Sequence, residues 1–512
     1  MRPRHPEELL SPTPNRPSSR AALAAGLTIL VLAAVAPGAI AQEADATWPQ
    51  YQGGAAHPGA LAEGPQPPFR VRWMLPAPAG EALSAAIVVG DRAISVGSEA
   101  VYAIDLQTGV EETIAARSGG PLSVPAFATV GSTPMVLYLE GPEASGAGAS
   151  PTPSGTPSPT QATTTSPGSE AVGPDEEVPA SFLVAVSLED RSELWRVPFG
   201  ATTRSGVTVD GGTAYVGDQQ RHVVAIALED GSVVWTADVP GRVDAPVAVA
   251  DGRVYVVARD GAAGQATIVA LDAATGERAW AVVPQATSTL ASAPSAGGGS
   301  VFVGAADRLV RSLAPEDGAE RWTSLVLSFF TPFTALAVAE GAVYAADVTA
   351  GLYRLDAADG RRRWGFQLND RVIRSAPVVS GSTVLLGLND GRLVAIDTDS
   401  GHLVWESEAS PGLVGTIALG TDVVVAVKGG RDAGLIAFEH DPDGALVDVP
   451  SPTELDAGTT FSRYGIAAAI VLILALIPGI ALRRRLGPVD LTGGVDLDDE
   501  EPAGGTDEGV EG

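Results

Sequence analysis

The chain has 512 residues, of which 45% are hydrophobic and 18% charged, and this composition supports a large buried core and excludes global disorder. It contains no cysteine, which excludes disulfides, thiolate metal ligands, cysteine nucleophiles and cysteine-linked lipids. The formal net charge of −29 argues against a duplex nucleic-acid partner, because neutralising phosphates requires a basic surface.

The N-terminal segment has the three parts of an export signal. Four arginines lie within residues 1–20, an apolar run covers 21–36, and Ala39-Ile40-Ala41 has the small-residue pattern of a cleavage site. We therefore expect a signal peptide over 1–41 and an opening segment over 42–68. The alternative is an N-terminal anchor that is not cleaved.

Six of the eight tryptophans are spaced by 40 to 45 residues, a period typical of repeat architectures. A glycine stands four residues before five of them, and Arg191 takes that place before Trp195. The six positions are Trp195, Trp235, Trp280, Trp322, Trp364 and Trp405.

Each repeat has the pattern of a β-meander. Apolar and β-branched residues alternate along its strands, as in Val254-Tyr255-Val256, which favours half-buried strands. The stretch 272–276, Asp-Ala-Ala-Thr-Gly, predicts a tight turn, in which the aspartate caps backbone amides and the glycine accepts a positive φ. Each tryptophan then falls on an outer strand, where its ring can bury area against the neighbouring repeat.

Eight strands of one type recur, near residues 104, 186, 226, 271, 313, 355, 396 and 437. They predict an all-β fold, an eight-bladed β-propeller over 69–449, with seven blades as the alternative if one weak unit is a cap. The first unit has Thr113 in the tryptophan position. The last, from Val414 to about Val449, contains Asp443-Gly444 as its turn and no tryptophan, and Trp48 and Trp73 lie outside the repeats. The strand Phe69–Trp73 has no hairpin before it and could join the last blade and close the ring.

An insertion over 141–180 enlarges the second unit. It holds twelve serines and threonines and eight prolines, without an aromatic or basic residue. We expect a disordered or O-glycosylated loop within the propeller.

The decapeptide 271–280, Leu-Asp-Ala-Ala-Thr-Gly-Glu-Arg-Ala-Trp, resembles the repeat of the pyrroloquinoline-quinone (PQQ)-like propeller family, and 48–54, Trp-Pro-Gln-Tyr-Gln-Gly-Gly, resembles the opening of its extracytoplasmic members. The resemblance covers about 48–449 and implies the propeller fold. The family includes quinoprotein dehydrogenases and the outer-membrane assembly lipoprotein of the BamB type, so fold alone does not assign an activity.

The sequence offers little support for quinoprotein chemistry. The resemblance implies a vicinal cysteine pair, a tryptophan floor and acidic calcium ligands, and the cysteines are absent. Asp272, Asp356 and Asp397 recur in register, which favours turn capping over catalysis. Asp441-Pro442-Asp443-Gly444 lacks the remaining ligands of a calcium loop, and the histidines lack metal-ligand spacing. We assign no catalytic, cofactor-binding or metal residue, and keep a PQQ-dependent dehydrogenase with calcium as the alternative.

One local feature departs from the repeat. Phe329, Phe330 and Phe333 fall between an outer strand and the next inner strand, where sister segments are polar. We expect them to form an apolar contact patch for a partner. The alternative is that they plug the axial channel or cover a blade end.

The C-terminal part predicts a membrane anchor. After a linker over 450–463, residues 464–482 form an uncharged apolar run long enough to cross a bilayer, and three arginines at 483–485 follow it directly. The segment 483–512 continues as an acidic tail that we expect to be disordered in the cytoplasm. The sequence thus predicts a single-pass protein of the cytoplasmic membrane, whose extracytoplasmic propeller binds a protein or envelope ligand without catalysis.

Overall fold

The computed structural model describes residues 46–120, 122–141, 181–199, 203, 205–260, 265–284, 292–305, 307–326, 335–347, 351–368, 371–430 and 432–450. All of them belong to one compact unit, 40–512. The predicted signal peptide, most of the insertion, the three phenylalanines and the predicted membrane span lie outside the described residues. Among those that are described, no helix is long and apolar enough to cross a membrane.

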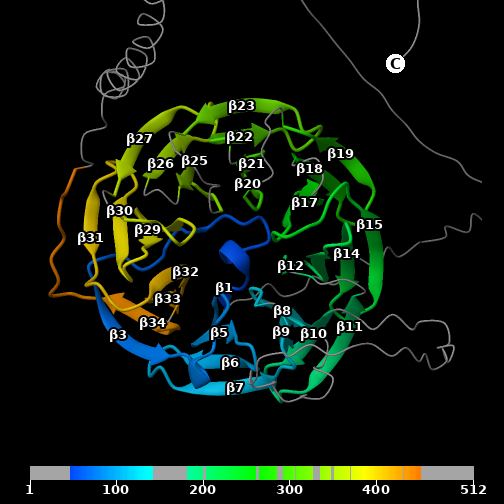
Figure 1. Ribbon diagram of the computed structural model, residues 1–512, viewed down its shortest axis with the longest axis horizontal. Coiled ribbons are helices and arrows are strands. Elements are labelled where there is room, and N and C mark those ends of the chain that lie inside the picture. Colours follow the sequence, from blue (N-terminus) through cyan, green and yellow to red (C-terminus); the bar gives the residue numbers. More distant parts are fainter. Residues whose placement is uncertain are drawn as a thin grey trace, which may run out of the picture. The chain divides into compact units, whose positions relative to one another are not determined.

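The described residues form eight antiparallel sheets around a common axis, as the sequence predicts (Figure 1). We number these blades 1 to 8 in chain order. Blade 1 comprises β4 (Ile87–Val89), β5 (Arg92–Val96), β6 (Ala100–Asp105) and β7 (Glu111–Ala116), and blade 2 comprises β8 (Ala126–Val130), β9 (Thr133–Glu140), β10 (Ser181–Ser187) and β11 (Glu193–Phe199). Blade 3 comprises β12 (Val207–Asp210), β13 (Thr213–Gly217), β14 (His222–Ala227) and β15 (Val233–Asp238), and blade 4 comprises β16 (Ala248–Ala250), β17 (Arg253–Asp260), β18 (Gln265–Asp272) and β19 (Arg278–Val282).

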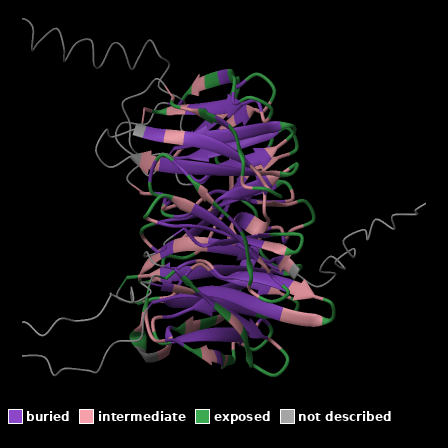
Figure 2. Cartoon of the chain, turned by 90° about the vertical axis from the view of Figure 1, so that its right-hand side faces the viewer, coloured by how far each residue is buried: buried purple, intermediate pink, exposed green. Residues whose placement is uncertain are grey.

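The remaining blades follow the same order from the axis outward. Blade 5 comprises β20 (Ser295–Gly297), β21 (Ser300–Gly304), β22 (Leu309–Leu313) and β23 (Glu320–Leu325), and blade 6 comprises β24 (Ala337–Ala339), β25 (Ala342–Ala346), β26 (Gly351–Asp356) and β27 (Arg362–Gln367). Blade 7 comprises β28 (Val378–Ser380), β29 (Thr383–Gly387), β30 (Leu393–Asp397) and β31 (Leu403–Glu406), and blade 8 comprises β32 (Leu413–Leu419), β33 (Val423–Gly429), β34 (Gly434–His440) and β3 (Phe69–Pro76). The middle strands of each blade are almost wholly buried, and most exposed residues lie in turns and loops (Figure 2).

The two ends of the propeller meet in blade 8. β3 pairs antiparallel with β34, from Phe69↔His440 to Pro76↔Gly434, so the N-terminal part of the chain supplies the outer strand of the C-terminal blade. The prediction that Phe69–Trp73 closes the ring is confirmed. Trp73 also takes the tryptophan position of this blade, which residues 414–449 by themselves do not supply.

The recurring tryptophans join neighbouring blades. In blade 3, Trp235 lies beside a bulge of the outer strand; its Nε1 donates to the carbonyl of Ala273, at 3.0 Å, in the turn of blade 4. Its ring also covers Gly276, which has a φ of +73°, and a Cβ there would lie 2.7 Å from the ring. Five other tryptophans make the same contact: Trp73, Trp195, Trp280, Trp322 and Trp364. The prediction that the rings bury area between blades is confirmed.

The junction of blades 1 and 2 differs on both sides. Thr113 replaces the tryptophan of blade 1, and Arg191 replaces the glycine of blade 2 with a φ of +63°. Arg191 reaches back to form an ion pair with Glu112. No ring lies on the Cα of residue 191, so a side chain has room there, and the loss of the tryptophan and the loss of the glycine occur together.

The predicted turns are also present. Oδ1 of Asp272 accepts bonds from the amides of Ala274 and Thr275 and from the Thr275 hydroxyl, and that hydroxyl bond holds the pKa of Asp272 below its usual value. Asp105 and Asp397 make the same contacts. These aspartates cap turns, as predicted, and this use accounts for their recurrence.

Candidate binding face and axial site

The meander gives the propeller two different faces. The first strand of each blade begins at a loop from the preceding blade, so these connectors and the loops between second and third strands share one face, which we call the connector face. The turns between first and second strands and between third and fourth strands share the opposite face, which we call the turn face. β9 ends and β10 begins on the connector face, and so do the end of β23 and the start of β24. Phe329, Phe330 and Phe333 fall in the sequence between β23 and β24, outside the described residues.

An N-terminal segment occupies the axis. Residues 46–61 comprise β1 (Ala46–Trp48), the short 3-10 helix η1 (Tyr51–Gly53) and β2 (Ala60–Leu61), and they cross the middle of the ring (Figure 1). β1 pairs with β4 of blade 1, and β2 pairs in parallel with β28 of blade 7. A second 3-10 helix, η2 (Pro78–Gly80), follows β3.

This axial segment is hydrogen-bonded to all eight blades. In five blades an amide of the innermost strand donates to one of its carbonyls: Phe127 to Pro49, Val249 to Ala55, Ala296 to Ala56, Val338 to Pro58 and Val379 to Gly59, at 2.7–2.8 Å. In blade 3 the side-chain amide of Gln50 accepts from the Val209 amide at 2.7 Å and donates to its carbonyl at 2.9 Å. Thr47 donates to Leu419 of blade 8 at 2.9 Å, and β1 serves blade 1. The segment therefore satisfies inner-edge backbone groups that the sheets leave without partners.

His57 is fully buried within the axial segment. Its Nδ1 lies 2.9 Å from the Pro294 carbonyl and so donates to it, and its ring meets Tyr51 edge-on with centroids 4.9 Å apart. Burial lowers the pKa of His57 to about 4, and burial raises the pKa of Tyr51 above its usual value. Both side chains are therefore neutral at pH 7.

A small cavity of about 40 Å³ lies against the axial segment on its connector side. Trp48, Tyr51 and Gln52 line it from the segment, and its walls come from blades 7, 8, 1 and 2: Ala85, Ala86, Val124, Ala376, Val378, Thr416 and Ile417. None of these residues carries a charge. Trp48 is 2% exposed and packs in the core between blades.

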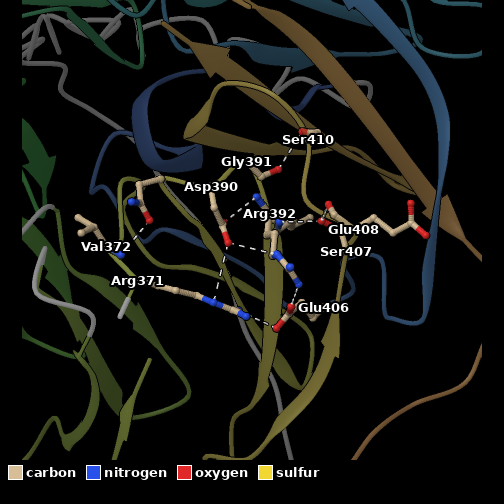
Figure 3. A network of polar contacts seen from close by, with 11 residues as sticks. Arg371, Val372, Asp390, Gly391, Arg392, Glu406, Ser407, Glu408 and Ser410 are labelled. Carbon is tan, nitrogen blue, oxygen red and sulfur yellow. Dashed lines mark hydrogen bonds and ion pairs between the residues drawn. The ribbon is translucent and has the colours of Figure 1, made fainter. Parts of the chain in front are cut away.

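A network of four charged side chains holds the connector into blade 7 (Figure 3). Arg371 and Arg392 both contact Glu406, the former at 2.8 Å, and Arg392 also contacts Asp390 at 3.2 Å. The hydrogen bond to Glu406 raises the pKa of Arg371. Two positive and two negative charges balance, so the network fixes the loops of the connector face rather than presenting a net charge to a ligand.

The base of the insertion is also fixed by polar contacts. Oε1 of Glu140, the last residue of β9, accepts bonds from the amide and hydroxyl of Ser118, and Oε2 lies 3.0 Å from Arg196. The neighbouring Arg117 donates to the Leu139 carbonyl at 2.7 Å. Glu140 is 3% exposed, and a buried carboxylate is stable only with such partners. The chain thus leaves for the insertion from a rigid point.

The three predicted contact residues, Phe329, Phe330 and Phe333, lie outside the described residues, so this interpretation stays a prediction.

The remaining histidines occupy separate places: His222 beside Asp218, His402 beside Asp448 and His440 beside Gln66. Asp441-Pro442-Asp443-Gly444 is a turn at the end of β34. In the part of the chain that the structure describes, no three acidic or histidine side chains gather as metal ligands. Sequence reasoning missed the axial role of 46–61, which only backbone pairing reveals.

Comparisons with known proteins agree with this fold. Residues 180–328 and 306–441 match the family described as "Outer membrane protein assembly factor BamB", together just over half of the chain. A stretch of 128 residues is 26% identical to the outer membrane protein assembly factor BamB of Yersinia pestis. That match spans 24% of this chain and 32% of the relative, about a third of its length.

Solved structures show the fold alone. A quinohemoprotein alcohol dehydrogenase from Pseudomonas putida HK5 superposes with a TM-score of 0.54 at 12% identity, covering 80% of this chain and 82% of that one. The computationally designed Ika8 protein superposes with a TM-score of 0.52 at 14% identity, covering 70% of this chain and 96% of that one.

Proposed function

The chain belongs to the BamB family of PQQ-repeat β-propellers, and from this membership we propose that it is a non-catalytic binding module that holds a protein or another envelope ligand. The curated relative is named as an assembly factor of outer membrane proteins. A propeller that serves assembly needs a rigid ring and an accessible face, and it needs no reaction centre.

The observation that carries this proposal is the axial segment. Quinoproteins hold their cofactor on the propeller axis, and here the chain's own residues 46–61 lie there, bonded to every blade. Ligand pockets for drug-sized molecules measure about 300–1,000 Å³, whereas the axial cavity measures about 40 Å³ and no acidic or basic residue lines it. The residues present therefore do not fit a quinone with calcium.

We assign the partner to the connector face. The turn face is built from short aspartate-capped turns, and the chain also crosses it between β2 and β3, where Ser380 and Ser382 bond to Pro65 and Gln66. On the connector face, instead, β9 ends and β10 begins, and β23 ends and β24 begins. In the sequence, the two segments that depart most from the repeat join these strand ends. Phe329, Phe330 and Phe333 are the proposed contact residues.

We further propose that residues 464–482 anchor the propeller in the cytoplasmic membrane, with the propeller outside and the acidic tail in the cytoplasm. The uncharged run and the arginines at 483–485 support this orientation. Ending the chain at 450 should release the propeller from membranes into the soluble fraction. Retention of that shortened chain by alkali-washed membranes would contradict the anchor.

Site-specific photo-crosslinking in cells tests the binding face. A photoreactive residue at Arg221 or Glu408 samples the connector face, and one at Gln107 or Ala274 samples the turn face; all four are exposed. We expect a discrete adduct from the first pair only. Phe329→Ser combined with Phe330→Ser should abolish it without lowering the melting temperature. Adducts from the turn-face positions alone would overturn the assignment, and a large loss of stability in the double variant would show that the rings are structural.

A further inference from the structure

We propose that the axial cavity is a binding site for a small uncharged polar group, an amide or an alcohol, which enters from the connector face. Residues that line the cavity carry buried polar atoms without hydrogen-bond partners in the described part of the chain. The lining contains no charged side chain that could pair with a charged ligand. The choice of ligand follows from three observations: the hydrogen-bonding groups, the cavity's size and its lining.

The hydrogen-bonding groups belong to two elements that line the cavity, the axial segment and β32. Gln52 is 5% exposed, and its Nε2 has no hydrogen-bond partner among the described residues. Thr416 lines the cavity from β32 of blade 8, and its Oγ1 is buried and likewise without a partner in the described part of the chain. Tyr51 adds a neutral phenol to the lining. Two residues that line the cavity thus carry polar atoms without partners, an amide donor and a hydroxyl that both donates and accepts. A ligand that bonds to them must supply complementary groups.

Size and charge narrow the ligand class. A volume of about 40 Å³ corresponds to roughly three water molecules on the scale of about 10–15 Å³ each. It therefore takes a carboxamide or a hydroxymethyl group, and not a sugar ring or a quinone. Ala85, Val378 and Ile417 form apolar walls, and no charged side chain lines the site. A carboxylate or an ammonium ion would lose its hydration there without compensation.

Two sources present this chemistry. A free amide or alcohol can diffuse in, or a partner can insert an asparagine or glutamine side chain from one of its segments. Ala85, Val124 and Ala376 end the connectors that lead into the innermost strands, so the cavity opens towards the proposed binding face. The second source rests on the proposed function, whereas the chemistry of the cavity does not.

Saturation-transfer NMR on the full chain in nanodiscs tests the site with acetamide as the probe and acetate as its charged control. We expect saturable transfer to acetamide and at least tenfold weaker transfer to acetate. Thr416→Val, which keeps the shape of a strand residue, and Gln52→Leu should each weaken acetamide binding at least tenfold. Ser410→Ala, elsewhere on the same face, should leave it unchanged. Melting curves of all three variants show whether they fold.

The proposal is overturned if acetate binds as well as acetamide, if folded Thr416→Val binds acetamide as the wild type does, or if no saturation occurs and the cavity holds water only. A blocked tripeptide with a central asparagine separates the sources. Binding at least tenfold tighter than acetamide identifies a partner side chain, and weaker binding identifies a free small molecule. Crosslinking to the connector face does not depend on these results, so either proposal can fail while the other stands.

Discussion

Two glycines of blade 4 isolate the contribution of the tryptophan contact. Gly252 and Gly276 have φ values of +72° and +73°, so an alanine at either position meets the same backbone strain. Their surroundings differ. A Cβ at Gly252 meets nothing within 4 Å, whereas a Cβ at Gly276 would lie 2.7 Å from the ring of Trp235. Gly252→Ala is therefore the matched control for Gly276→Ala.

The expected free energies of unfolding follow from these distances. Left-handed backbone costs a non-glycine residue about 1–2 kcal/mol, which both variants lose. Gly276→Ala also pushes the ring away, an overpacking that costs typically about 1–3 kcal/mol. It further weakens the bond from Trp235 to Ala273, worth about 1 kcal/mol. We expect Gly276→Ala to cost about 2–4 kcal/mol more than Gly252→Ala.

Chemical denaturation of the two variants measures this difference, and a double-mutant cycle locates its origin. In a Trp235→Leu background, Gly276→Ala should cost no more than Gly252→Ala, because the ring that it meets is gone. Equal costs for the two glycines in the wild-type background would refute the reasoning. So would an excess cost of Gly276→Ala that persists without Trp235.

Three further predictions concern the axis and the closure of the ring. His57→Asn keeps a donor and tolerates the positive φ. The pKa of His57 is about 4 when folded and 6.5 when unfolded. As the pH falls from 6.5 to 4, the wild type should therefore lose about 3 kcal/mol more stability than the variant, measured by urea denaturation. Gln50→Ala should cost about 2 kcal/mol in the same assay, because it leaves both backbone groups of Val209 without partners. Trp73→Leu should cost about 2–4 kcal/mol and increase amide exchange in β3 first, because the ring no longer covers Gly109; uniform exchange would contradict this.

The blades could be predicted from the sequence because the signals that define them are local. The spacing from Gly276 to Trp280, the capping residue Asp272 and the alternating strands all lie within one repeat. The closure by Phe69–Trp73 was also predictable, since a strand without a hairpin partner needs a distant one.

The axial segment could not be predicted in the same way. Residues 46–61 have no periodic pattern of apolar residues. Most of their contacts use backbone carbonyls, and because every residue has one, the sequence does not indicate which of them form bonds. Their partners are distant in sequence; Thr47 and Leu419 are 372 positions apart. Trp73 has no repeat around it in the sequence for a related reason, because strands from the other end of the chain complete its blade. The three phenylalanines lie outside the described residues, so the candidate contact patch stays a prediction.

The most direct test of the account is a titration of the full chain with PQQ and calcium, followed by thermal unfolding. Ligand binding to the folded state must raise its stability, by about 2.7 kcal/mol at a hundredfold excess over the dissociation constant. The account predicts no saturable shift in melting temperature, because the axial segment 46–61 is bonded to all eight blades where the cofactor would sit. A saturable rise of several degrees, together with dye-linked oxidation of an alcohol, would contradict it and assign the protein to the quinoprotein dehydrogenases.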